Sequence, residues 1–290
     1  MKKCIFCNST QEITKEHIFS KRFRKLNKIK VENLSHVSPK LPYKGFVAKK
    51  DINRIKLELK SQRNYSVYSL VNGSVCKKCN KDFLGKIDLD IENTLTILMG
   101  DENLNRNISK TEWQQFALWV YKTILTLVHP KTINFKKIIP KEVYEDFYFT
   151  RKIPDDIVIS VAKLKDFVRF EGPLWEIGQD FILTFSPRSR IANNLQFEER
   201  YIINRGNLPI SEDVLFLQQQ LKGCFHIVLN LNGILVRIAY IPSTEIFKYN
   251  FQNKEIIINP IFIGVNEGKL IEYDSIVKFK NSLQLIYTGY

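Results

Sequence analysis

Two CxxC pairs constrain the fold of this chain more than any other feature of its sequence. Cys4 and Cys7 form one pair, Cys76 and Cys79 form the other, and 68 residues separate Cys7 from Cys76. A two-residue gap lets both sulfurs of a pair turn toward one ion, and four thiolates bind Zn²⁺ tetrahedrally with no position left for a substrate. We therefore expect these cysteines to hold a structural zinc ion that brings the two pairs together.

The rest of the composition is that of a folded cytoplasmic protein. The chain has 290 residues, 44% of them hydrophobic, which is enough to fill a core. It contains no apolar run of the roughly 18 residues that would span a bilayer, and its first residues lack the apolar segment of a signal peptide. The fifth cysteine, Cys224, is interpreted as a buried thiol, because the cytosol keeps thiols reduced. We expect no association with a membrane.

Positive charge is concentrated in the first third of the chain. The net charge is +14, and residues 1–100 contain 21 Lys and Arg against 9 Asp and Glu, whereas the remaining residues contain 23 against 21. Residues 18–75 alone contain 14 basic and 3 acidic residues, with aromatic residues interspersed. A field of this kind attracts polyanions, so nucleic acid is the first partner to consider. A solvated basic face is the alternative.

The hydrophobic pattern predicts an α+β protein with helices before residue 130 and antiparallel strands after residue 155. A helix is expected from Asn80, because apolar residues recur on one face at spacings of four and three. Ser109-Lys-Thr-Glu112 is a capping box that predicts the start of a second helix, which Pro130 ends. Further along, β-branched residues alternate with others, and Asn232-Gly233 between two such runs predicts a hairpin.

We predict two domains. Residues 1–100 form the first, with residues 18–75 as a long basic insertion, and residues 101–290 form a helical and β-rich second domain. The boundary is placed at 100–108, where Gly100 and a polar stretch interrupt the helical pattern.

A Glu-His pair and an asparagine stand beside the two CxxC pairs. Glu16 and His17 follow the first pair, and Asn80 comes directly after Cys79. If one ion joins the pairs, these residues become neighbours at the start of the helix. Carboxylate and amide oxygens bind hard cations, and a neutral imidazole can take a proton from water. Alternatively, His17 packs near the zinc or is a further zinc ligand.

The order CxxC, Glu-His-Ile and CxxC-Asn resembles the zinc-bearing HNH endonucleases, a bacterial ββα-metal family with a treble-clef type of zinc site. Similar bacterial HNH proteins also share features with "VCKKCNKDFLGKID" and "WQQFALWVYKTILTL", so the resemblance covers roughly residues 1–130. It implies that His17 is the general base and that Glu16 and Asn80 hold a catalytic Mg²⁺ or Mn²⁺ ion. It also implies that the cysteines hold zinc.

Other family positions match less closely. Many members have Asp where Glu16 stands. The asparagine that steadies the hairpin loop in the family has two candidates here, Asn72 and Asn64. Asp88 matches an acidic position, and we expect it either to pair with another residue, to cap the helix or to bind metal.

The leading hypothesis is a metal-dependent endonuclease acting on DNA, with a role in phage defence or mobile-element biology. Basic residues near the cysteines are expected to contact nucleic acid; they are Lys21, Arg22, Arg24, Lys25, Lys77 and Lys78. The alternative is a non-catalytic, zinc-stabilised module that binds nucleic acid or regulates another protein. Under either hypothesis, we expect the C-terminal region to mediate self-association or to bind a regulatory partner.

Overall fold

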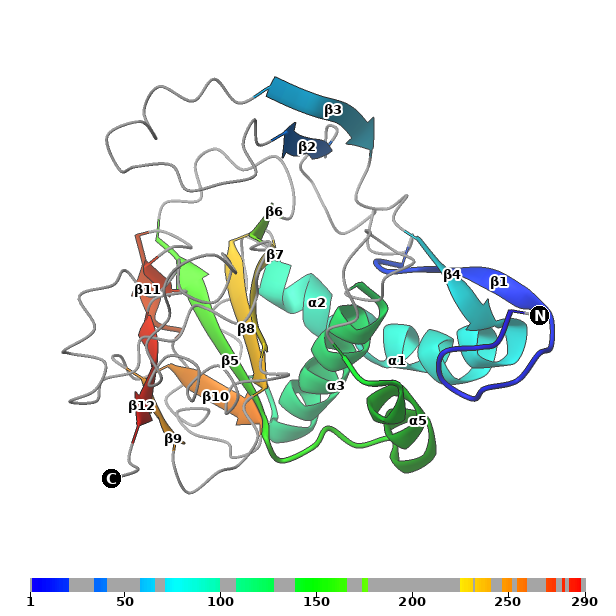
Figure 1. The fold of residues 1–290 in the computed structure, drawn as a ribbon. Helices are drawn as coiled ribbons and strands as arrows, with labels where there is room; N and C mark the ends of the chain where they lie inside the picture. The colour runs from blue at the N-terminus through cyan, green and yellow to red at the C-terminus, as the bar shows by residue number, and fades with distance from the viewer. Residues whose placement is uncertain are drawn as a thin grey trace.

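The chain folds into a mixed structure of helices and largely antiparallel sheet (Figure 1). The computed structural model describes residues 2–20, 34–40, 58–65, 71–99, 108–127, 139–165, 174–176, 225–231, 233–240, 247–251, 255–259, 270–274, 278–279 and 282–287. Side chains are described for all of these except residues 34–40, 58–65, 99, 174–176, 225–226, 229–230, 247–251 and 284–287. The α+β class predicted from the sequence agrees with this architecture.

Two strands far apart in the sequence form the N-terminal sheet. β1 (Ile13–His17) pairs antiparallel with β4 (Val71–Cys76), so that Ile13 lies opposite Cys76 and His17 opposite Val71. The register shifts by one residue between Thr14 and Glu16, which places an extra residue in β4. Within the insertion, β2 (Leu34–Lys40) pairs antiparallel with β3 (Glu58–Tyr65).

A helical segment follows β4 without a loop. It begins as the π-helix η4 (Cys79–Leu84), continues as α1 (Gly85–Asp90) and ends as α2 (Glu92–Met99). The apolar stripe predicted from Asn80 onward is buried as expected; it consists of Phe83, Ile87, Ile91, Leu95 and Leu98. The sequence thus predicted the buried face of this segment, although not its π-helical start.

The helix α3 (Lys110–Leu127) starts at the predicted capping box. The Glu112 backbone N–H donates to Ser109 Oγ at 3.2 Å, and the Ser109 backbone N–H donates to Glu112 Oε2 at 2.8 Å. All residues of α3 from Trp119 onward are buried. A helix that is buried all round must be covered by other elements on every side.

The larger sheet contains six strands in the order β10, β5, β8, β7 and β6, with β11 parallel to β5. Their bounds are β5 (Ile157–Leu164), β6 (Leu174–Glu176), β7 (Phe225–Leu231), β8 (Ile234–Tyr240), β10 (Ile256–Asn259) and β11 (Glu272–Tyr273). Leu231 lies opposite Ile234 across the turn between β7 and β8, and Gly233 has a φ of 89°. The hairpin predicted from Asn232-Gly233 is confirmed.

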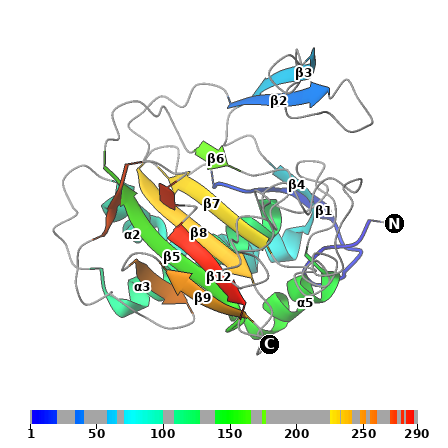
Figure 2. The same cartoon turned by 60° about the vertical axis from the view of Figure 1, so that its left-hand side comes forward.

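Both faces of this sheet are covered. Ile159 and Val161 of β5 join the core that includes α3, whereas Ala162 and Leu164 join a second cluster with Phe279. Figures 1 and 2 show β9 (Phe247–Phe251) and β12 (Leu283–Tyr287), an antiparallel pair, on the face away from α3. Burial on two sides explains why β5 is almost continuously apolar.

A buried polar network connects segments on the face of the larger sheet that points away from α3. Glu255 accepts hydrogen bonds from Ser160 and Tyr273, each at 2.7 Å, and pairs with Arg237 at 3.1 Å. Ser282 donates to Glu255 as well. Because a buried charge is costly without partners, this cluster fixes the segments that contribute to it.

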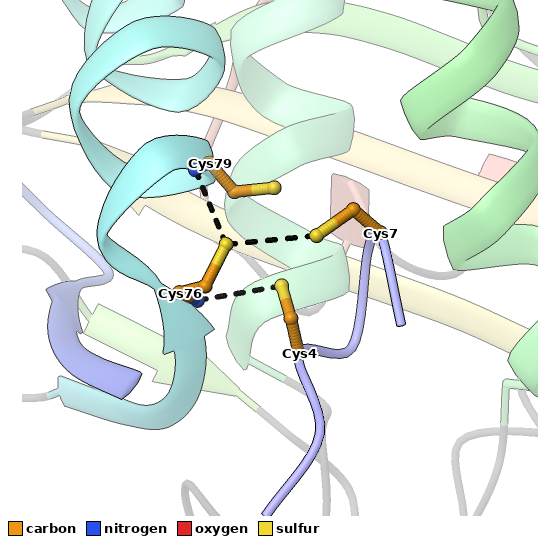
Figure 3. A group of neighbouring side chains, drawn as sticks. All are labelled: Cys4, Cys7, Cys76 and Cys79. Carbon is orange, nitrogen blue, oxygen red and sulfur yellow. Dashed lines mark hydrogen bonds between the residues drawn. The ribbon is translucent and has the colours of Figure 1, made fainter. Parts of the chain in front are cut away.

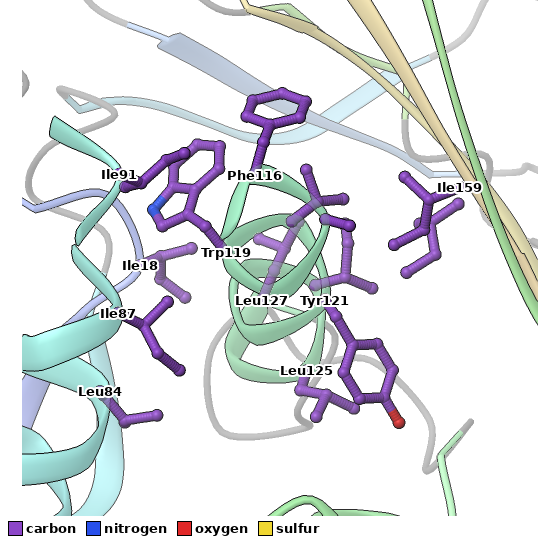
Figure 4. Close-up of a cluster of buried hydrophobic side chains, with 14 of the residues drawn as sticks. Ile18, Leu84, Ile87, Ile91, Phe116, Trp119, Tyr121, Leu125, Leu127 and Ile159 are labelled. Atoms are coloured by element: carbon purple, nitrogen blue, oxygen red, sulfur yellow. The ribbon is translucent and has the colours of Figure 1, made fainter. Parts of the chain in front are cut away.

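One hydrophobic core connects the N-terminal unit to the larger sheet through α3. Figure 4 shows Ile18 and Ile87 on one side of α3 and Ile159 of β5 on the other. The helix α5 (Lys141–Thr150) closes this core with Tyr144 and Phe147, whose rings pack against Phe6. The domain boundary predicted at 100–108 lies outside the described residues apart from Ile108, so it stays a prediction.

None of the helices described is both long and apolar enough to cross a membrane.

The π-helix explains why residue 85 is a glycine. Gly85 donates its backbone N–H to the Asn80 carbonyl. A Cβ at position 85 would lie 2.9 Å from that oxygen.

Gly85→Ala is therefore expected to destabilise the protein by roughly 1–3 kcal/mol through overpacking, although alanine is ordinarily the better helix former. Denaturant unfolding measures the effect. Gly73→Ala is the matched control, because a Cβ there meets nothing within 4 Å. A stabilised Gly85→Ala variant would show that the π-helical turn is absent.

Candidate metal centre

The four cysteines of the two CxxC pairs meet at one point, and we call them the cysteine cluster (Figure 3). Their sulfurs all lie within 4.8 Å of one another. Cys4 and Cys7 come from the N-terminal turn, whereas Cys76 ends β4 and Cys79 begins η4. The meeting of the two pairs, predicted from their spacing, is confirmed.

Local backbone geometry explains why each pair can turn inward. In the first turn, the Cys4 N–H donates to the Ser9 carbonyl at 2.8 Å, and Asn8 adopts a φ of 60°, the left-handed conformation that asparagine tolerates. The turn is fixed to β4 because the Ile5 N–H donates to the Ser74 carbonyl at 2.9 Å. Main-chain groups also point at sulfur, since the Cys76 N–H donates to Cys4 Sγ at 3.3 Å.

The cluster fits a tetrahedral thiolate site. Zinc–sulfur bonds of about 2.3 Å place the four sulfurs about 3.8 Å apart. The sulfurs of Cys7 and Cys76 lie 3.5 Å apart, and all four sulfurs lie within 4.8 Å of one another, which is compatible with that value. Three of the four cysteines are buried, and Cys7 is partly exposed. The cysteine cluster can therefore hold one metal ion, and its four ligands leave no open position on that ion.

The cluster also favours a thiolate before any ion binds. A hydrogen bond with the Cys79 side chain, helped by backbone hydrogen bonds and opposed by burial, lowers the pKa of Cys4 to about 4. The pKa of Cys79 shifts in the opposite direction, because its hydrogen bond to Cys4 and its burial raise it. Burial raises the pKa of Cys7. The cluster thus presents a negative sulfur to a cation, and thiolate is the form that binds metal.

Removing one ligand tests the metal centre. Cys76→Ser is expected to lower bound zinc well below one ion per chain and to lower the melting temperature, because the binding free energy of a structural metal contributes to folding. Elemental analysis and thermal unfolding with and without a chelator measure both effects. Cys224→Ser, which changes the cysteine outside the CxxC pairs, is the control. Full zinc content in Cys76→Ser would contradict a four-cysteine site.

Glu16 lies in the core rather than at the surface. Only 4% of its surface is exposed, and its Oε1 is 2.9 Å from Nζ of Lys122 on α3. The same ammonium donates to Asp88 Oδ1 at 3.0 Å and Oδ2 at 3.1 Å. We call Glu16, Lys122 and Asp88 the ion triad. Of the roles considered for Asp88, pairing is the one seen. A cation bound at Glu16 would therefore have to share the carboxylate with Lys122.

Asn72 connects β4 to α3. It lies opposite Glu16 in the strand pair and is fully buried. Its amide nitrogen donates to the Thr126 carbonyl at 3.1 Å, and its amide oxygen accepts the Ser74 N–H at 3.0 Å. These bonds hold β4 against α3, and the assignment of Asn72 to the family's middle asparagine stays a prediction. The other candidate, Asn64, lies in β3, where side chains are not described.

Asn80 contacts the strand that carries Glu16. Its amide nitrogen donates to Thr14 Oγ1 at 3.0 Å and to the Lys15 carbonyl at 3.4 Å. Asn80 thus contacts β1 at Thr14 and Lys15, whereas its predicted proximity to Glu16 and His17 stays a prediction. No described residue donates to the Asn80 amide oxygen, so this end of the amide is the one that suits a cation.

His17 ends β1 and is partly exposed. Because successive side chains of a strand point to opposite faces, its imidazole leaves β1 on the face opposite to that of Glu16. A single substrate could meet both residues only near the end of the strand.

Two of the six predicted nucleic-acid contacts are described. Lys77 and Lys78 are exposed between Cys76 and Cys79, and Lys77 Nζ pairs with Glu12 at 2.8 Å. The exposure of both groups lets this pair rearrange at little cost. Lys21, Arg22, Arg24 and Lys25 lie outside the described residues.

Sequence reasoning missed Lys122. The signal was present, because Lys122 is the only charged residue in the run 119–127, and lysine is almost never fully buried unless it is paired. A lone lysine on an apolar helix predicts an acidic partner in the core.

No protein-family model matches this chain, and no curated protein or solved structure matches it either.

Proposed function

We propose that this protein is a metal-dependent endonuclease of the HNH type that hydrolyses phosphodiester bonds in DNA. The observation that carries the proposal is the cysteine cluster, which joins the end of β4 and the start of η4 to the N-terminal turn. Asn80 thereby comes against β1, the strand that ends in Glu16 and His17. A strand pair followed by a helix, with a metal at their junction, is the arrangement that the family resemblance implies.

The donor set supports a structural zinc ion in the cysteine cluster. Four thiolates in two CxxC pairs are typical of structural zinc, and a complete tetrahedral shell excludes direct catalysis by that ion. Its role is to hold β1 and η4 together across the 68-residue separation.

His17, Glu16 and Asn80 would have different roles in catalysis. His17, as a neutral imidazole, would accept a proton from the attacking water. The Glu16 carboxylate and the Asn80 amide oxygen would hold a hard divalent cation, because oxygen donors are the ligands that such ions prefer. Bound Mg²⁺ or Mn²⁺ would supply positive charge to the phosphate in the transition state.

The charge distribution supports a nucleic-acid substrate. Lys77 and Lys78 project beside the cysteine cluster, and the insertion supplies most of the net positive charge of the chain. Contacts of this kind neutralise phosphates and position the backbone without reading its sequence.

The base is tested by His17→Ala. This variant is expected to nick supercoiled plasmid in Mg²⁺ or Mn²⁺ about 10²- to 10⁴-fold more slowly than the wild type, because it lacks the proton acceptor. Zinc content and DNA binding are expected to stay unchanged. His129→Ala serves as a matched histidine control. Wild-type nicking by His17→Ala would remove the assignment.

A non-catalytic, zinc-stabilised nucleic-acid-binding module is the second candidate. The burial of Glu16 against Lys122 favours it, since a carboxylate held in the core is less accessible to a cation from solvent. Under this alternative the protein binds DNA with a steep salt dependence and yields no product with any divalent metal. Nicking by purified wild-type protein, abolished by EDTA, decides between the two.

A further inference from the structure

The C-terminal end of α5 carries an exposed aromatic ring beside two basic residues. Phe149 has 75% of its surface exposed, and Arg151 and Lys152, which follow it, are exposed as well. Residues 147–154 contain these two basic side chains and no acidic one. We call Phe149, Arg151 and Lys152 the α5 tip.

Arg151 adopts a backbone conformation that glycine would adopt more easily. Its φ is 58° and its ψ is 24°, which is the left-handed conformation, and its N–H donates to the Phe147 carbonyl at 3.1 Å. Glycine is the residue most often found in this conformation after a helix, because it has no Cβ to strain. A strained arginine here points to a role that depends on its side chain.

Two aromatic rings orient the Arg151 guanidinium. Its Cζ lies 3.5 Å from the ring centroid of Phe83 and 4.4 Å from that of Tyr148, and the two rings are nearly perpendicular, at 78°. Stacking uses the faces of the guanidinium and leaves the N–H groups at its edge to donate hydrogen bonds. No carboxylate among the described residues pairs with Arg151. The guanidinium is thus an oriented, exposed donor for an anion.

The α5 tip lies against the segment that carries the cysteine cluster. Phe83, which Arg151 covers, comes four residues after Cys79 and packs on Phe6 of the N-terminal turn, with the ring centroids 5.9 Å apart. Figure 1 shows α5 next to α1 and this turn. A ligand bound at the α5 tip is therefore held close to the residues that flank the cysteines.

The charge around the α5 tip favours nucleic acid over a protein partner. Residues 77–86 of the adjoining segment contain four lysines, all exposed, and one acidic residue. The helix dipole also favours cations at the C-terminal end of α5, which accounts for basic residues there. It does not account for an exposed phenylalanine among them.

We propose that the α5 tip binds a single-stranded segment of the DNA substrate, with a phosphate on the Arg151 guanidinium and an unpaired base stacked on Phe149. The inference rests on the proposed function for the identity of this ligand. A planar guanidinium binds phosphate through two parallel N–H donors, and an exposed ring stacks on a base of any kind. In a duplex the faces of the bases are stacked on one another, so the α5 tip selects DNA with unpaired bases rather than a sequence.

The test is the binding of a fluorescently labelled oligo(dT) strand, and of a duplex of the same length, to the zinc-loaded, full-length protein. Fluorescence anisotropy is measured at several salt concentrations without added Mg²⁺ or Mn²⁺, so that no strand is cleaved. Phe149→Ala is expected to weaken oligo(dT) binding about 5-fold or more, because the stacked base is lost, and to leave duplex binding unchanged. Phe149→Trp keeps an exposed ring and is expected to bind oligo(dT) as tightly as the wild type.

Arg151→Gly tests the phosphate contact. Glycine adopts the left-handed conformation without strain, so zinc content and melting temperature are expected to stay close to those of the wild type. The slope of log affinity for oligo(dT) against log salt concentration is expected to become shallower by about 0.7, because one phosphate contact is lost. Lys141→Gln, which removes an exposed charge from the first turn of α5, is the matched control and should bind as the wild type does.

Wild-type oligo(dT) affinity in Phe149→Ala would overturn the inference, as would an equal loss on duplex and oligo(dT), an unchanged salt slope in Arg151→Gly, or no oligo(dT) binding by the wild type. If Arg151→Gly does not fold, Phe149→Ala decides alone, because its ring is exposed. Self-association that is lost in Phe149→Ala, with DNA binding retained, would identify a protein interface and also overturn the inference. Binding of oligo(dT) through the α5 tip without nicking of supercoiled plasmid would contradict the proposed function alone.

Discussion

Four sulfurs hold together two segments of this protein that the chain itself keeps far apart. The 68 residues between Cys7 and Cys76 form a loop whose closure costs entropy, and that cost grows only slowly with loop length. A metal bound by the cysteine cluster can offset this cost, because its binding free energy becomes folding free energy. The pairing of β1 with β4 and the contact of Asn80 with β1 depend on this junction. The long basic insertion can therefore be accommodated without disturbing the site.

The helix α3 is the second element on which the structure depends. It packs against the helical segment after β4 on one side and against the larger sheet on the other, so its apolar side chains belong to a single core. Lys122 and the Thr126 carbonyl, on the same face of α3, receive Glu16 and Asn72 from the N-terminal sheet. The position of the Glu-His strand is thus set by the cysteine cluster at one end and by buried polar contacts with α3 at the other. A substitution on α3 can consequently affect the candidate site without being near the cysteines.

Much of this arrangement follows from local signals in the sequence. The capping box at Ser109, the apolar stripe after Asn80 and the Asn-Gly turn before β8 each depend on neighbouring residues, and each was predicted. The convergence of the cysteines also followed, because two CxxC pairs are the usual ligand set of one structural zinc ion. The order of the strands in the larger sheet could not be predicted from the sequence, since strands with similar apolar patterns can pair in many ways.

The parts that the sequence did not reveal depend on contacts between distant residues. Glu16 was interpreted only as a metal ligand, because its partner Lys122 lies more than 100 positions away and looks like a surface lysine when taken alone. The cluster around Glu255 was missed for the same reason, as its partners come from separate strands and segments. The π-helical start of η4 also has no simple pattern, although a glycine at position 85 is required by the close approach of the Asn80 carbonyl.

X-ray absorption at the zinc edge of the purified, full-length protein tests the central claim most directly. If the cysteine cluster joins the two segments, the spectrum will show one zinc ion per chain with four sulfur neighbours at about 2.3 Å and no nitrogen or oxygen in the first shell. A first shell that includes nitrogen would indicate a histidine ligand, and His17 would then no longer be the base. A protein that is folded and contains no zinc would contradict the account entirely.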